Sequence, residues 1–163
     1  EGASIAVAPS AGSAGDANVI TDARGQATIH WTLGRQSGGQ RLALTVGERG
    51  IAASVTARAE PGAAANVELQ APPTAGTAGR ALSKTITALV TDAYGNAVPD
   101  VLTLFTASAG TVSAARVMTS DKGLAATRWT LGSQTGPQTL TAVVRGTAAK
   151  TTLTVQAAAA TRR

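Results

Sequence analysis

The sequence has 163 residues, enough for one ordinary domain or two small ones, and its formal net charge is +5. It contains no cysteine, which excludes disulfide bonds, a thiol nucleophile and a cysteine-ligated zinc site. Aromatic residues make up 2% of the chain and charged residues 14%, against about 25% charged residues in a typical soluble domain. The many threonines and valines, interrupted by glycine-containing turns, indicate an all-β fold.

The distribution of charge limits the classes of partner. A net positive charge can attract nucleic acid, anionic lipid or an acidic protein, but the basic residues are scattered and only Arg162 and Arg163 are adjacent. Single-stranded nucleic acid also needs aromatic stacking platforms, and the chain has one Phe, one Tyr and two Trp. We therefore expect no nucleic-acid partner. No apolar run reaches about 18 residues, so we expect no membrane span.

An internal repeat organises the chain. A constant shift that places Trp31 on Trp129 aligns the two halves without a gap. Residues 31–42 and 129–140 then share the pattern W-T-L-G-x-Q-x-G-x-Q-x-L. Residues 66–99 have no counterpart ahead of Glu1. We therefore expect a complete second copy and a first copy that lacks its opening strands.

Side-chain alternation predicts an inward face in the first copy, residues 1–60. Its members are Ala27, Ile29, Trp31 and Leu33 in one strand and Leu42, Leu44 and Val46 in the next. His30 is predicted to face outward. Residues 61–65 follow as a short linker, because Pro61, Gly62 and three alanines interrupt the strand pattern.

The second copy, residues 66–158, has the strand spacing of a β-sandwich. Strands are predicted at 66–70, 82–92, 99–107, 111–119, 124–131, 138–145 and 149–157, with glycine-containing turns at 93–96, 120–123 and 132–137. The inward residues are Ala125, Thr127, Trp129 and Leu131, opposite Arg128, and then Leu140, Ala142 and Val144. A basic tail, residues 159–163, ends the chain.

Each tryptophan is predicted to anchor the core of its copy. Burial of one large aromatic side chain contributes on the order of 2–3 kcal/mol. The alternative is an exposed tryptophan that stacks on a sugar or another ligand. The inward alternation of Trp31 and Trp129 favours the core.

Two turn motifs of the second copy resemble those of bacterial immunoglobulin-like domains. Residues 91–99 read T-D-A-Y-G-N-A-V-P and resemble the V-x-D-x-x-G-N-P-V-x-G signature of that family, with Ala97 as a departure; residues 119–125 resemble its T-D-x-x-G-x-A turn. Domains of this invasin and intimin type occur in adhesins and long exported repeat proteins. The resemblance implies tandem immunoglobulin-like β-sandwiches, the first lacking its opening strands, located outside the cytoplasm. The family has no common catalytic residues to carry over.

No catalytic, cofactor-binding or metal-binding site is predicted. His30 is the only histidine, and nothing in the sequence places a serine or aspartate beside it. A calcium site needs several converging oxygens, and the candidate ligands are Asp22, Asp92, Asn96, Asp100 and Asp121. Because these residues lie on more than one turn, capping of their own turns is the favoured interpretation.

Several functions fit such a chain. The first is a structural or adhesive module of an exported bacterial protein, in the periplasm or at the cell surface. The second is an extracytoplasmic accessory subunit, peripherally associated with a larger membrane-bound complex such as a respiratory or photosynthetic one. The third is a filament subunit that exchanges strands with its neighbours. A polysaccharide-binding module is disfavoured by the shortage of aromatic residues.

The incomplete first copy is where we expect a protein partner, because open sheet edges invite pairing with another chain. A first copy that begins in mid-fold, in a sequence that starts at Glu1, also fits a processed form or a segment of a longer repeat protein whose missing strands lie upstream.

Overall fold

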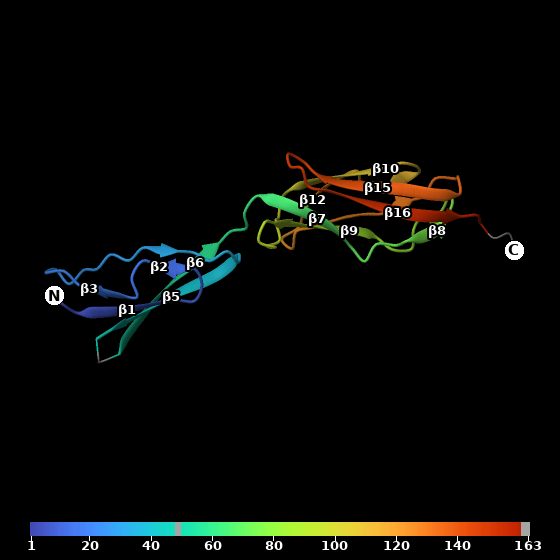
Figure 1. The fold of residues 1–163 in the computed structure, drawn as a ribbon. Coiled ribbons are helices and arrows are strands. Elements are labelled where there is room, and N and C mark those ends of the chain that lie inside the picture. The colour runs from blue at the N-terminus through green and yellow to red at the C-terminus, as the bar shows by residue number, and fades with distance from the viewer. Residues whose placement is uncertain (48–49, 161–163) are drawn as a thin grey trace. The chain divides into compact units, whose positions relative to one another are not determined.

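The computed structural model describes residues 1–47 and 50–160. The chain divides into two compact units, unit 1 (Glu1–Pro61) and unit 2 (Gly62–Arg163). All regular elements of the described residues are β-strands, as Figure 1 shows. The predicted all-β fold is therefore confirmed. Of the predicted basic tail, Ala159 and Ala160 belong to no strand, and residues 161–163 lie outside the described residues.

Unit 2 is a sandwich of two main sheets with one core between them. Its strands are β7 (Ala64–Gln70), β8 (Ala75–Thr77), β9 (Ile86–Asp92), β10 (Leu102–Ala107), β11 (Thr111–Val112), β12 (Arg116–Met118), β13 (Leu124–Thr127), β14 (Trp129–Thr130), β15 (Gly136–Val144) and β16 (Lys150–Ala158). One sheet has the order β12-β10-β15-β16-β8 and the other β13-β9-β7, while β11 and β14 form a separate pair. Alternate residues of β9 and β15 meet in the core, which closes the sandwich.

Three strand predictions for unit 2 were wrong in detail. The predicted strand 111–119 is divided into β11 and β12, and 124–131 into β13 and β14, because each half pairs with a different partner. The predicted strand 82–92 begins only at Ile86. Strand β8 was not predicted, since Pro72, Pro73 and Gly76 obscure a short edge strand. β7 begins at Ala64, inside the stretch predicted as a linker.

Unit 1 repeats one half of this architecture. Its strands are β1 (Ser4–Pro9), β2 (Ser13–Ala14), β3 (Asn18–Ile20), β4 (Trp31–Thr32), β5 (Gly38–Val46) and β6 (Ile51–Ala59). The sheet order β3-β1-β5-β6 and the pair β2-β4 match the order β12-β10-β15-β16 and the pair β11-β14 of unit 2. Among the described residues of unit 1, nothing corresponds to the sheet β13-β9-β7. The first copy therefore lacks its opening strands, as predicted.

The predicted inward face of unit 2 is confirmed. Ala125 and Trp129 have no exposed surface, and Thr127 and Leu131 are buried beside them. In unit 1 the matching residues, Ala27, Ile29, Trp31 and Leu33, are only half-buried. The prediction that Trp31 anchors a core as Trp129 does was therefore wrong in degree, because the second sheet that covers Trp129 has no equivalent in unit 1.

A set of matched hydrogen bonds holds the same local frame in both units. The indole Nε1 of Trp31 donates to the carbonyl of Ala11 at 3.1 Å, and that of Trp129 donates to the carbonyl of Ala109 at 2.9 Å. In unit 2 the Gln138 side chain accepts from the Gly132 amide at 2.7 Å and donates to the Gln134 carbonyl at 2.7 Å. The corresponding three residues of unit 1 make the same bonds. The shared sequence pattern is thus a shared network of hydrogen bonds.

Gly110 is required by a close backbone contact. Its φ is +78°, and a Cβ atom at this position would collide with the carbonyl oxygen of Thr130. Gly12 has the same φ and the same collision, with the carbonyl of Thr32. Gly146 also has a positive φ, of +80°, but its added Cβ would meet nothing within 4 Å.

We expect Gly110→Ala to destabilise unit 2 much more than Gly146→Ala. Left-handed backbone costs a non-glycine residue roughly 1–2 kcal/mol, which both variants incur, whereas only Gly110→Ala adds the collision. A loss of 1 kcal/mol lowers the Tm of a domain this size by about 4–8 °C. Differential scanning calorimetry measures both; equal losses would contradict the role of the contact.

The two tryptophans give a second comparison. Trp129→Ala is expected to cost unit 2 about 3–5 kcal/mol, the range for truncation of a large core aromatic, and Trp31→Ala to cost unit 1 clearly less. Urea unfolding followed by hydrogen exchange and mass spectrometry resolves the two units separately. Equal costs would show that Trp31 is covered as fully as Trp129.

Candidate functional site

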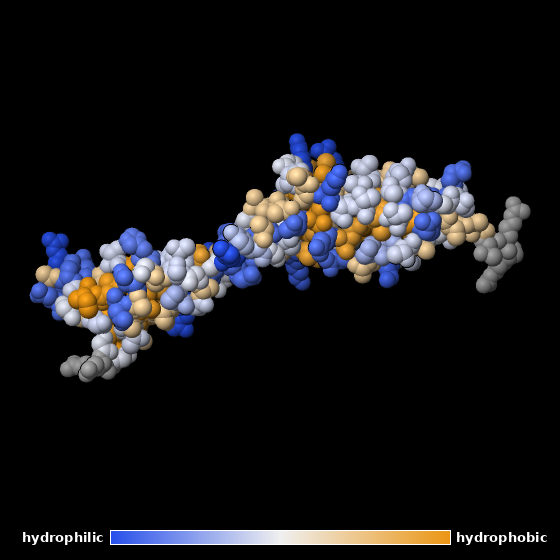
Figure 2. Space-filling view, viewed as in Figure 1, coloured by the Kyte–Doolittle hydropathy of each residue, from blue (hydrophilic) through white to orange (hydrophobic). Residues whose placement is uncertain are grey.

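The feature of unit 1 that stands out is a sheet face with no second sheet over it. Leu42, Leu44 and Val46 of β5 lie opposite Val55, Ala53 and Ile51 of β6, so these side chains share one face. In unit 2 the equivalent face is the core. We call the inward side chains of β5 and β6, together with residues 26–33, the open face. Figure 2 shows that apolar residues reach the surface of unit 1.

Exposure along β6 shows where the covering layer is missing. In β16 buried and exposed residues alternate, and Leu153 is 6% exposed. Its match in β6, Val55, is 52% exposed, and Ile51 is 64% exposed. Both faces of β6 are exposed from Ile51 to Thr56. Large apolar residues at these positions are typical of a surface that another element covers.

The backbone next to the open face also differs from that of unit 2. β13 pairs with β9 over residues 124–127, whereas residues 26–29 of unit 1 form no strand. A Cβ on Gly123 would lie 2.6 Å from the carbonyl oxygen of Val90, whereas one on Gly25 would meet nothing within 4 Å. The turn of unit 1 has a glycine at the same position as the turn of unit 2, but no backbone lies beside Gly25 as that of Val90 lies beside Gly123.

The hydrogen bonds that join residues 80–82 to the β14 region in unit 2 have no equivalent at β4. In unit 2 the Leu82 amide donates to the Trp129 carbonyl at 2.9 Å, and the Leu131 amide donates to the Arg80 carbonyl at 3.0 Å. Among the described residues of unit 1, the Trp31 carbonyl and the Leu33 amide have no such bonds. Backbone groups at a sheet edge are a ready site for strand pairing.

The outer edge of β6 is the last open position. In unit 2 the parallel strand β8 pairs with β16, and the Gln156 amide donates to the Thr74 carbonyl at 3.0 Å. β6 is an edge strand of its sheet. The open face therefore combines the exposed side chains of Ile51 and Val55, beside a buried Leu42, with unpaired strand edges.

The D-x-x-G-N turn of unit 2 was the other candidate site. The Asp92 carboxylate accepts four hydrogen bonds: from the amides of Tyr94 (2.8 Å), Asn96 (2.9 Å) and Gly62 (2.8 Å), and from the Asn96 side chain (2.8 Å). Asp92 thus caps its own turn, as predicted. It also holds the first residue of unit 2, Gly62, a contact that the sequence pattern did not indicate.

The remaining calcium candidates lie apart. Asp22 accepts hydrogen bonds from the amides of Arg24 and Gln26, both at 2.8 Å. Its turn in unit 1 is the equivalent of the turn that begins at Ser120 in unit 2. Asp100 and Asp121 are exposed, and Asp100 has a φ of +55°. Within residues 1–47 and 50–160, no three His, Cys, Asp or Glu side chains are grouped so that they could hold a metal ion.

Opposing effects set the pKa of Asp92. Burial raises it, because desolvation disfavours the charged carboxylate, but hydrogen bonds from the Asn96 side chain and from the amides of Gly62, Asn96 and Tyr94 outweigh burial. Together they lower the pKa from its ordinary value of 3.8 to about 2. The folded state therefore favours the charged form, and this contribution to stability is complete above about pH 4.

We expect the Asp92 contribution to be lost as the pH falls from about 4 to about 2, because the carboxylate is protonated in the unfolded chain before it is in the folded one. Asp92→Asn should cost on the order of 1–3 kcal/mol at neutral pH, since buried donors lose an acceptor, and the cost should shrink over that window. Asn96→Ala removes one donor and should move the acid loss to higher pH. Urea unfolding at a series of pH values measures this; a constant cost of Asp92→Asn from pH 7 to 2 would contradict it.

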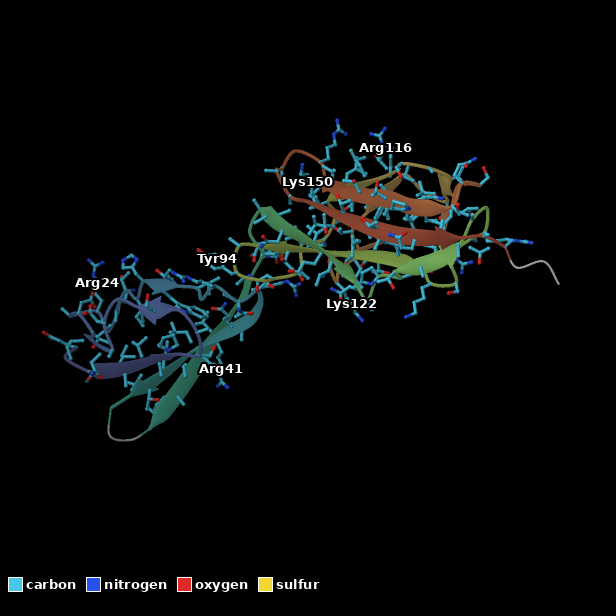
Figure 3. The ribbon with its side chains drawn as sticks, turned by 45° about the vertical axis from the view of Figure 1, so that its right-hand side comes forward. Arg24, Arg41, Tyr94, Arg116, Lys122 and Lys150 are labelled. Atoms are coloured by element: carbon cyan, nitrogen blue, oxygen red, sulfur yellow. The ribbon has the colours of Figure 1, made fainter. Side chains whose placement is uncertain are left out.

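The basic residues labelled in Figure 3 do not gather on one face of their unit. Figure 3 shows Arg24 and Arg41 on different sides of unit 1, and in unit 2 it shows Lys122 pointing away from Arg116 and Lys150. His30 is exposed, as predicted. The described part of the chain contains no helix that is long and apolar enough to span a membrane.

Comparison with known proteins supports the fold. No protein-family model and no curated protein matches the sequence. Among solved structures, InvD of Yersinia pseudotuberculosis matches with a TM-score of 0.67 and 23% identity, over 98% of this chain and 48% of that chain. The D0-D1 domain of intimin matches with a TM-score of 0.48 and 16% identity, over 96% of this chain and 81% of that chain. A β-glycosidase from Bacteroides vulgatus matches with a TM-score of 0.50 and 13% identity, over 94% of this chain and 21% of that chain.

The match to InvD shows that this chain shares the fold of that protein, in agreement with the tandem immunoglobulin-like β-sandwiches that the turn motifs predicted. The chain spans about half of the length of InvD. At this identity the likeness establishes the fold alone. The match to part of a glycosidase chain illustrates why: one fold serves many proteins, so function has to be argued from the site.

Proposed function

We propose that this chain is a non-catalytic structural and adhesive module of an exported bacterial protein, and that it acts through protein–protein contacts. The observation that carries the proposal is the open face of unit 1, where Ile51 and Val55 are exposed on a sheet whose equivalent in unit 2 is a core face. The fold shared with InvD supports a place outside the cytoplasm. The turn residues, which cap their own backbone, serve the fold.

Labelling of intact cells tests the location. An antibody raised against unit 2 is expected to stain intact cells of the source bacterium, or cells whose outer membrane alone has been opened, and protease treatment should remove the signal. Staining that appears only after the inner membrane is disrupted would contradict the proposal. The first two outcomes separate the cell surface from the periplasm.

The accessory-subunit and filament alternatives use the same open face in different assemblies. An accessory subunit requires co-migration of the chain with one large membrane complex, and a filament subunit requires a ladder of polymers. For the module we expect neither when detergent extracts are separated by native mass. If the chain migrates in one large assembly of fixed mass, and mutation of Val55 releases it, the accessory-subunit alternative would replace the module proposal.

A further inference from the structure

The repeat itself shows what covers such a face. In unit 2, residues 62–98 supply β7, β8, β9 and the segment that pairs with β14. Each of these elements is missing from unit 1, whereas every other strand of unit 2 except β13 has its match there. Because the two units share one register throughout, unit 2 defines the covering layer of unit 1 position by position.

We propose that the open face of unit 1 is an acceptor for an antiparallel strand pair of a partner polypeptide with the chemistry of residues 62–98. This inference rests on the proposed function in one respect, the open face as the binding surface, and it names the partner.

The apolar side chains of the covering layer define its chemistry. In unit 2, Ile86, Ala88 and Val90 of β9 are buried against a core that includes Leu153 and Val155 of β16. Residues at every second position point inward, as a half-buried strand requires. The occupant of the open face must therefore present an alternating apolar strand to Val55 and its neighbours.

The backbone of unit 1 sets a second requirement. Residues 26–29 need an antiparallel neighbour in the position of β9, and the Trp31 carbonyl and Leu33 amide need one in the position of residues 80–82. Gly25 leaves space where the backbone of Val90 lies in unit 2. A polypeptide with one strand in the position of β9 and a preceding segment in the position of residues 80–82 meets these requirements together.

A second copy of the chain meets fewer of them. Two open faces pressed together would cover Ile51 and Val55, but each sheet would bring only its own β5 and β6 inward faces. Sheet-on-sheet contact forms no hydrogen bonds to the backbone of residues 26–29 or to Leu33. The unpaired ladders therefore favour a strand pair over self-association.

The experiment is a graft on the full chain. The sequence of residues 62–98 is joined ahead of Glu1, and amide exchange is followed by mass spectrometry. Exchange in residues 26–33 and 51–59 is expected to slow by at least about tenfold, the sign of a newly cooperative unit. A control graft carries Ile86→Asp and Val90→Asp in the grafted copy only and should give no protection.

Matched substitutions make the test specific to the open face. Val55→Asp should be tolerated in the ungrafted chain, where this side chain is 52% exposed, but should abolish the protection given by the graft. Leu153→Asp, at the same position of unit 2, should destabilise its unit with or without the graft.

Two results would overturn the inference. One is exchange in unit 1 that the intact graft leaves unchanged. The other is an ungrafted chain that is already a dimer, in which a Val55→Cys variant forms a disulfide bond between the two copies. Neither result bears on where the protein is located in the cell, so failure here is distinguishable from failure of the proposed function.

Discussion

A β-sheet with an apolar face needs a second layer to exclude water from that face. In unit 2 the layer is β13-β9-β7, and its contact with the larger sheet buries Trp129, Leu140 and Val155. Apart from β8, the same larger sheet exists in unit 1, built from matching residues with matching hydrogen bonds, but without the layer. The half-burial of Trp31 and the exposure of Val55 both follow from this one difference.

The comparison of the two units separates local from long-range causes of structure. The turn glycines, the indole bond to the residue before Gly12 or Gly110 and the glutamine bridge of Gln40 or Gln138 form in both units. These features therefore need only neighbouring residues and one sheet, which contains β1 and β5 in unit 1 and β10 and β15 in unit 2. Full burial of the tryptophan and formation of a strand at residues 26–29 need the second sheet as well, so they occur in unit 2 alone, although Leu42 of unit 1 is buried without that sheet.

Sequence reasoning succeeded where the signal was periodic or repeated. The inward faces of unit 2, the glycine turns and the missing opening strands of unit 1 could all be predicted, because alternation and self-similarity report directly on a shared fold. The division of residues 124–131 at Arg128 could not, since alternation continues through it while the pairing partner changes. Strand β8 also escaped, because its pairing with β16 is parallel and distant in sequence. The sequence predicted open sheet edges in the first copy. The exposure of Ile51 and Val55 could be found only from the structure, which gives the pairing of β5 with β6.

The bond between Asp92 and the Gly62 amide has a mechanical consequence. Tension transmitted along the chain from Pro61 enters unit 2 at Gly62, whose amide is held by the carboxylate at 2.8 Å. The first contact to bear the load is thus a charge-assisted hydrogen bond, stronger than a neutral one. Asp92 is in turn held to β7 through its backbone carbonyl, which accepts from the Asn66 side chain at 3.3 Å. A pull on the junction is therefore shared between β7 and the end of β9, and does not simply peel β7 from the sheet.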